Sequence, residues 1–215
     1  MKKVLLILLT LAVVITGTFV SCKKNQEDKK IEVIDLSAKN ESQKIRIVSN
    51  DNDWKLIASK NLETINKLVN SNIDVNKLDF SNEDAFLKVL GKTRNQYINE
   101  SREIKAAANR LVKKYNITPQ PNIECISCKT NSEETILKIK RTVKLLKENK
   151  ELYSRFEELM ETQRLYDDEL DDTGGGGACC PWRFYACVTL CAATIEFFPA
   201  YLLCSAFCYD TYCCK

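Results

Sequence analysis

Cysteines are the residues whose type and spacing could do chemistry in this 215-residue chain. Clustered cysteines form disulfides in oxidising compartments, whereas in a reducing cytosol they indicate metal binding or redox chemistry. The compartment therefore decides how the cluster is interpreted. Eight of the eleven cysteines lie in the last 37 residues, in a nearly mirror-symmetric order: Cys179, Cys180, Cys187, Cys191, Cys204, Cys208, Cys213 and Cys214.

The N-terminus predicts export. Two lysines precede an apolar run over residues 4–20, which is typical of a signal peptide, and we assign residues 1–22 to it. Ser21 and Cys22 resemble a bacterial lipobox, which implies lipidation of Cys22. An ordinary signal peptide and an uncleaved membrane anchor are the alternatives. All three place the other cysteines outside the cytoplasm. We expect the chain to be anchored by lipid in the cell envelope, or secreted after release of its C-terminal peptide.

The C-terminal segment, residues 178–215, is predicted to be a disulfide-stapled α-hairpin. Pro181 and Pro199 are each suited to the first turn of a helix, where the missing N–H costs nothing, so the chain should turn near residues 197–199. Consecutive glycines at 174–177 precede the segment, and they should form a flexible hinge because they have no side chains to pack. We take residues 173–177 as a domain boundary.

Helical spacing predicts which of these cysteines pair. Cys187 and Cys191 are four residues apart, as are Cys204 and Cys208. Side chains at this spacing have Cβ atoms about 5–6 Å apart, whereas a disulfide needs about 3.5–4.5 Å. Bridges should therefore run between antiparallel helices, as Cys187–Cys208 and Cys191–Cys204. The two outer cysteine doublets should pair with each other, with the choice of partners open.

A second cysteine motif, Cys125-x-x-Cys128, lies in the middle region. A catalytic thiol–disulfide exchanger needs a helix N-terminus within a βαβ unit, and the surrounding pattern does not suggest one. We expect a small structural disulfide here. A redox role and bridges to other cysteines are the alternatives.

The middle region predicts a helical carrier domain over residues 59–172, after a tether and short extended region over residues 23–58. The overall fold class is therefore mainly α, with a helical middle domain plus the stapled hairpin module. Apolar residues alternate with polar ones at Ile31, Val33, Ile45 and Ile47, which fits a brief strand or hairpin. Helices are expected over 59–70, from a start at 81–84 to Gly91, over 93–115, and from a cap at Asn131 along one apolar stripe to Met160.

Composition excludes several classes of function. The chain has no histidine, which removes Ser-His-Asp and Cys-His catalysis and histidine-bound metals, and we expect no enzyme activity and no cofactor. A net charge of +3, spread over mixed Lys and Glu positions, argues against nucleic acid. A thiolate metal site is disfavoured by the bulky aromatic residues between the cysteines, so we expect no metal.

Those aromatic residues are the candidate contact surface. If sulfur fills the interior of the hairpin, the rings face outward and form an amphipathic surface suited to a membrane or envelope target. A packed mini-core is the alternative reading. The candidate contact residues are Trp182, Phe184, Tyr185, Phe197, Phe198 and Tyr201.

The order of lipobox-type signal, helical middle, glycine run and eight-cysteine end resembles the fulvocin C-related bacteriocin family. The resemblance implies an antibacterial peptide matured from the C-terminus of a precursor, acting on a bacterial membrane or envelope. A processing protease cutting at Gly174, Gly175, Gly176 or Gly177, and an immunity protein, are the partners it implies. Two alternatives are a surface lipoprotein whose cysteine module binds a partner and is never released, and a thiol oxidoreductase that uses the Cys125-x-x-Cys128 motif. In the surface-lipoprotein alternative, the glycine run is only a linker.

Overall fold

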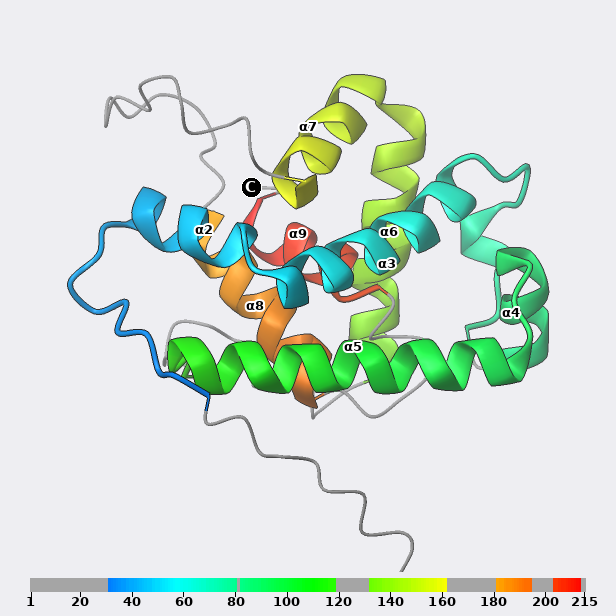
Figure 1. Ribbon diagram of the computed structural model, residues 1–215. Helices are drawn as coiled ribbons and strands as arrows, with labels where there is room; N and C mark the ends of the chain where they lie inside the picture. The colour runs from blue at the N-terminus through cyan, green and yellow to red at the C-terminus, as the bar shows by residue number, and fades with distance from the viewer. Residues whose placement is uncertain (1–30, 81, 119–131, 162–180, 195–202, 214–215) are drawn as a thin grey trace, which may run out of the picture. The chain divides into compact units, whose positions relative to one another are not determined.

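The computed structural model describes residues 31–80, 82–118, 132–161, 181–194 and 203–213, and within them the fold is all helical (Figure 1). The prediction of a mainly α fold is confirmed. We call α2 to α7 the carrier helices and α8 with α9 the helix pair. The elements are α2 (Glu41–Ser49), α3 (Asn52–Val69), the 3-10 turn η1 (Val75–Lys77), α4 (Glu83–Leu90), α5 (Arg94–Tyr115), α6 (Ser132–Glu148), α7 (Lys150–Glu161), α8 (Pro181–Thr194) and α9 (Cys204–Tyr212).

The predicted extended region is wrong at Ile45 and Ile47, which lie in α2. Asn40 caps this helix, because its side chain accepts a hydrogen bond from the backbone of Gln43 while the Gln43 side chain accepts one from the backbone of Asn40. Ile45 and Val48 are both fully buried, three residues apart, as one face of a helix requires. The capping signal and this three-residue spacing outweigh the short alternation on which the strand prediction rested.

The long α5 helix confirms the helix predicted over residues 93–115. The α3 helix is longer than the helix predicted for that part of the chain. Thr93 caps α5 through a capping box with Gln96, and the helix ends at Tyr115 as expected. The helix expected over residues 59–70 begins earlier, at Asn52, because the Asp51 side chain caps it and Trp54 is buried in its first turn.

Two further boundaries come from single residues. Gly91 ends α4 with φ of 62°, a left-handed conformation that glycine adopts without strain. The expected helix to Met160 divides at Asn149, whose amide N–H donates to the Leu145 carbonyl of α6 while its side-chain oxygen accepts from the Leu152 amide of α7. Asn149 thus ends one helix and caps the next.

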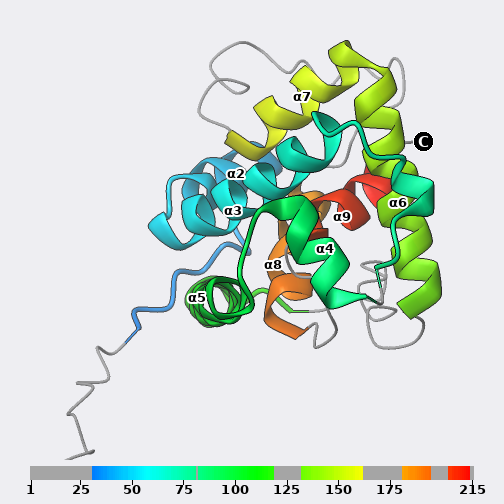
Figure 2. The ribbon, with the colours of Figure 1, turned by 90° about the vertical axis from the view of Figure 1, so that its right-hand side faces the viewer.

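The helix pair lies among the carrier helices within the unit Glu32–Lys215. Figures 1 and 2 show α8 packed on α5 and α9 packed on α6, with α8 and α9 side by side and α3 against both. Residues 184–193 are each at most 9% exposed. A helix that is apolar on all sides must be covered on all sides, and the carrier helices provide that cover. Glu32–Lys215 form one compact unit, so the described residues of the segment 178–215 share their core with the carrier helices.

Asp51 ties α3 to α5 through an almost buried carboxylate, whose side chain is 7% exposed. It accepts hydrogen bonds from the Asp53 amide at 2.8 Å, the Lys114 ammonium at 2.7 Å and the Tyr115 hydroxyl at 2.8 Å. Burial alone would raise the pKa of Asp51, but these hydrogen bonds and the Lys114 charge together lower it below its ordinary value. Burial and the Asp51 carboxylate together raise the pKa of Tyr115 to about 12.

The pH dependence of stability should report this carboxylate. Because the pKa of Asp51 is lower in the folded protein than in the unfolded chain, its stabilisation is present at neutral pH and is lost as pH falls through the folded value, below about pH 4. We expect Asp51→Asn to lower the free energy of unfolding by about 1–3 kcal/mol at pH 7 and by much less at pH 2. Urea unfolding across this range measures the difference. The control Glu158→Gln, on an exposed part of α7, should change stability at pH 7 by less than about 0.5 kcal/mol.

Candidate functional site

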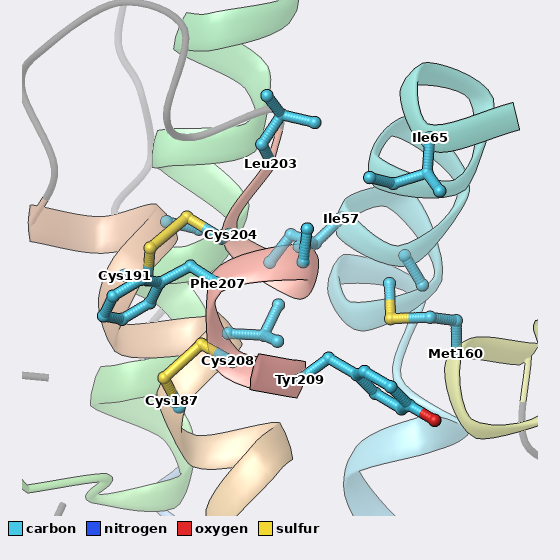
Figure 3. Close-up of a cluster of buried hydrophobic side chains, with 14 of the residues drawn as sticks. Ile57, Ile65, Met160, Cys187, Cys191, Leu203, Cys204, Phe207, Cys208 and Tyr209 are labelled. Atoms are coloured by element: carbon cyan, nitrogen blue, oxygen red, sulfur yellow. A yellow bond between two sulfur atoms is a disulfide. The ribbon is translucent and has the colours of Figure 1, made fainter. Parts of the chain in front are cut away.

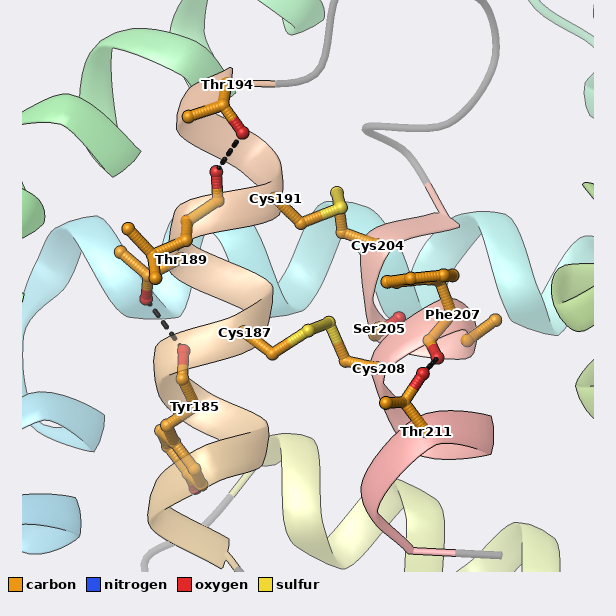
Figure 4. Close-up of a disulfide and its surroundings, with 12 residues drawn as sticks. Tyr185, Cys187, Thr189, Cys191, Thr194, Cys204, Ser205, Phe207, Cys208 and Thr211 are labelled. Carbon is orange, nitrogen blue, oxygen red and sulfur yellow. Dashed lines mark hydrogen bonds between the residues drawn. A yellow bond between two sulfur atoms is a disulfide. The ribbon is translucent and has the colours of Figure 1, made fainter. Parts of the chain in front are cut away.

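Two disulfides link the helix pair in the predicted register. Cys187 bonds to Cys208 with Cα atoms 5.9 Å apart, and Cys191 bonds to Cys204 with Cα atoms 5.8 Å apart. Figure 4 shows the bridges as two rungs between α8 and α9, one helical turn apart. Each helix presents its two cysteines on one face, as the spacing of four residues requires. The predicted pairing of these four cysteines is confirmed.

A third bridge involves Cys213, which is also disulfide-bonded. Its partner is none of the four cysteines above, so that partner lies outside the described residues. The remaining cysteine predictions are outside them as well. These concern Cys22, Cys125, Cys128, Cys179, Cys180 and Cys214.

Three threonine hydroxyls on the helix pair donate hydrogen bonds to carbonyls of their own helix. Thr189 donates to the Tyr185 carbonyl at 2.9 Å, Thr194 to the Leu190 carbonyl at 2.7 Å, and Thr211 to the Phe207 carbonyl at 3.0 Å (Figure 4). Each bond stays within one helix and spans four residues. The helix pair can therefore present these threonines to an apolar environment without leaving their hydroxyls unpaired.

The candidate contact aromatics that are described face inward, so the outward prediction is wrong for Phe184 and Tyr185. Both are 0% exposed. Tyr185 stacks on Trp54 of α3 with ring centroids 4.3 Å apart, and its hydroxyl donates to the Leu159 carbonyl of α7 at 2.9 Å. Phe184 meets Tyr209 edge to face. Carrier helices cover these rings because the helix pair has too little surface of its own to bury them.

The other candidate contact residues are differently placed. Trp182 is half-buried at the start of α8, and the Lys44 ammonium lies 5.7 Å from its ring centroid. Phe197, Phe198 and Tyr201 lie outside the described residues, as do Pro199 and the processing residues 174–177. The second helix of the pair, α9, is described over Cys204–Tyr212, and its predicted start at Pro199 lies outside the described residues.

Two buried polar side chains of the carrier helices bind the backbone of α9. The Asn61 side-chain oxygen, from α3, accepts a hydrogen bond from the Ser205 amide at 3.0 Å. The Thr142 hydroxyl, from α6, donates to the Ala206 carbonyl at 2.9 Å. Both side chains are 0% exposed. Sequence reasoning missed them, although each is a polar residue at an apolar-stripe position of its helix, which is the available signal.

A surface pocket of about 220 Å³ lies beside Trp182. Asp35, Lys44 and the end of α5 near Tyr115 contribute to its lining. The Asp35 carboxylate accepts a hydrogen bond from the Ser37 amide, which lowers the pKa of Asp35, and the Tyr115 hydroxyl already donates to Asp51. The Asp35 carboxylate and the Tyr115 hydroxyl of this pocket therefore already have partners within the chain.

The described part of the chain meets neither the requirements of a metal site nor those of a membrane-spanning helix. No three potential metal ligands gather there, and none of its helices is long and apolar enough to cross a membrane. No protein family, no curated protein and no solved structure matches this chain. The disulfide-linked helix pair and the carrier residues that hold it are therefore the candidate functional site.

Proposed function

We propose that the chain is an exported bacteriocin-like precursor whose C-terminal segment, residues 178–215, is an antibacterial effector. Residues 1–22 direct export, and Cys22 carries the lipid anchor. The carrier helices keep the effector covered until a protease cuts near the glycine run at 174–177. The effector then acts on the membrane or envelope of other bacteria without catalysis, and an immunity protein protects the producer.

One observation carries this proposal: the two bridges for which both cysteines are described close within the effector itself. Cys187–Cys208 and Cys191–Cys204 both join two residues of the segment 178–215. The described carrier residues contain no cysteine. Their contacts with the helix pair are apolar contacts, hydrogen bonds, the Arg141–Asp210 ion pair, and the cation–π contacts of Lys44 and Lys138. If the Cys213 bridge also closes within the segment 178–215, a cut in the glycine run would leave a covalently stapled unit held to the carrier helices by non-covalent contacts.

Burial of the helix pair explains how such an effector stays harmless before release. The described apolar side chains over residues 184–193 and 203–209 are hidden, with α3, α5 and α6 among the helices that cover them, so this part of the intact precursor does not present them to a membrane. After release, the same surface would favour a lipid interface because transfer of apolar area out of water is favourable. A helix of 14 residues, the length of α8, extends about 21 Å and is shorter than the roughly 30 Å hydrocarbon core. Perturbation of the interface is therefore favoured over a single-helix span.

The same burial favours a second function, a lipid-anchored surface protein that is never cut. In this reading α8 and α9 are permanent core helices, because removing them would strip α3, α5 and α6 of their packing partners. The disulfides then stabilise an envelope-exposed domain, and the partner binds elsewhere on its surface.

Controlled cleavage of the full chain tests the first function against the second. A specific protease site replaces residues 174–177, and dye leakage from vesicles of bacterial phospholipids is measured before and after cutting. We expect leakage only after the cut. The matched control carries the same site within residues 119–131, where cutting nicks the chain but leaves the helix pair joined to α7, and it should give no leakage. No leakage from either cut chain would contradict the effector function and favour the anchored protein.

A further inference from the structure

We propose that the carrier helices α3 and α6 are an intramolecular template that selects the disulfide register of the helix pair. This role requires no release of the C-terminal segment, so it is independent of the effector function proposed above. Three observations carry it. The cysteine spacing allows more than one pairing, α9 is short and its start has no capping side chain of its own, and the carrier contacts to α9 lie between its two bonded cysteines.

The cysteine spacing alone does not define one register. With both bridges formed, Cys187 faces Cys208 and Cys191 faces Cys204. A slip of α9 by four residues, about 6 Å along its axis, would instead bring Cys187 to Cys204 or Cys191 to Cys208. Each slipped form closes one bridge of this set and leaves two thiols free to pair with other cysteines of the segment. Something other than sulfur must set the register.

The α9 helix has little capacity to place itself. It has nine residues, and its N-cap residue, Leu203, has no side-chain hydrogen bond to the helix. Helices shorter than about 12–15 residues are marginal on their own, and an uncapped start leaves backbone N–H groups unpaired. The α9 helix therefore depends on groups from outside its own sequence.

The carrier helices supply those groups at the required positions. Asn61 accepts from the Ser205 amide and so takes the place of a capping side chain for α9. Thr142 donates to the carbonyl of the next residue, Ala206. Ser205 and Ala206 both lie between Cys204 and Cys208, the two cysteines that must be kept in register. Figure 3 shows Ile57 of α3 beside α9.

The first helix of the pair is fixed in the same way. Tyr185 lies two residues before Cys187, and its ring and hydroxyl are held by Trp54 of α3 and by the Leu159 carbonyl of α7. Both ends of the Cys187–Cys208 bridge are thus placed by carrier residues. A slipped α9 would lose the two hydrogen bonds to the buried Asn61 and Thr142 side chains, which is costly.

The chemistry of each bridge is ordinary oxidation by a disulfide donor. Two cysteine thiols lose two protons and two electrons as their S–S bond forms, and a donor such as oxidised glutathione takes up both and becomes two thiols. Wrong bridges rearrange by thiol–disulfide exchange with no net oxidation. The template changes neither step. It determines which thiols meet.

Oxidative refolding of the full chain tests this role. The chain is reduced, unfolded in guanidinium and refolded in a mixture of reduced and oxidised glutathione, and digestion without reduction followed by mass spectrometry counts the Cys187–Cys208 and Cys191–Cys204 peptides. We expect Asn61→Leu to lower the yield of this pairing about fivefold and Thr142→Val to lower it in the same direction. Wrong pairs should rise correspondingly.

Two controls separate a template from simple stability. Asn109, on an exposed part of α5, makes the same kind of side-chain bond to a carbonyl four residues earlier as Asn61 does, so Asn109→Leu should leave pairing unchanged. Phe86→Leu, in α4, destabilises the carrier helices away from the helix pair. The two variants are compared at conditions where they lose the same free energy of unfolding. The template is supported if Asn61→Leu then forms wrong disulfides while Phe86→Leu forms the correct ones. Equal scrambling in both, or correct pairing in Asn61→Leu, would overturn it.

Discussion

Replacing Tyr185 with alanine is expected to lower the free energy of unfolding by about 3–5 kcal/mol, as for other large buried aromatic residues. The side chain is 0% exposed, stacks on Trp54 and donates a hydrogen bond to the Leu159 carbonyl. Its removal leaves a cavity between α8 and α3 and removes the hydrogen bond to the Leu159 carbonyl of α7. Urea unfolding of the oxidised chain measures the loss.

Graded variants show where this energy comes from. Tyr185→Phe keeps the ring and removes only the hydroxyl, and should cost about 1 kcal/mol. Trp182→Ala, three residues earlier on the same helix and half-buried, should cost less than Tyr185→Ala. A Tyr185→Ala loss below about 1 kcal/mol would mean that α8 does not pack against the carrier helices as described here, because full burial of a ring is worth more than that.

Removing one bridge is the second large effect that we expect. The double variant Cys187→Ala with Cys208→Ala opens a loop of 21 residues and should lower the free energy of unfolding by about 3 kcal/mol in the chain-entropy description. The double variant at Cys191 and Cys204 opens a loop of 13 residues and should cost about the same, since the dependence on loop length is logarithmic. Denaturant unfolding of each variant, with the other bridge intact, gives both values.

Unchanged stability of a double variant would contradict this account of the bridges. If either double variant were as stable as the unaltered chain, the carrier contacts alone would hold the helix pair, and the cysteines would serve only the segment after release. The two bridges should also be protected in the intact chain, because all four sulfur-bearing residues are 0% exposed. Reduction by dithiothreitol should therefore be slow in buffer and should accelerate in urea that opens the fold.

The helix pair and the carrier helices depend on each other for their cores. Loss of α8 and α9 would expose the faces of α3, α5 and α6 that now cover them. The proposed release therefore has a consequence for the part that stays behind: the carrier helices should unfold or be degraded once the segment leaves. In an uncut anchored protein, the same interdependence would make residues 178–215 indispensable for folding.

Features that depend on residues close in the sequence, such as helix starts and the pairing of helical cysteines, could be predicted from the sequence. Thr93 and Gln96 form the expected helix start, and the four-residue spacing of the cysteines gave the correct pairing of Cys187 with Cys208. The strand at Ile45 and Ile47 was wrong because two alternating pairs of residues are too short to outweigh the capping box at Asn40. Periodicity identifies such elements well when their pattern is long.

The position of the helix pair could not be predicted from composition. An aromatic, cysteine-rich segment after a glycine run suggests a separate module, but glycines set only the freedom of the backbone and not the surface on which α8 packs. The inward direction of Tyr185 depends on Trp54, which is 131 positions earlier in the chain. Likewise, Asn61 and Ser205 are 144 positions apart. Such pairs are created by tertiary packing, and no periodicity within one helix records them.

Intact mass spectrometry of the producing cells tests the central claim, that the stapled segment is released from its carrier. Culture supernatant and membrane fractions are measured with and without reduction. We predict a supernatant fragment that begins near Gly177 or Ala178 and is lighter than its reduced form by eight hydrogens, as four disulfides among its eight cysteines require. A full-length, lipid-modified chain found only in the membrane fraction would contradict release and establish the helix pair as the permanent core of an anchored protein.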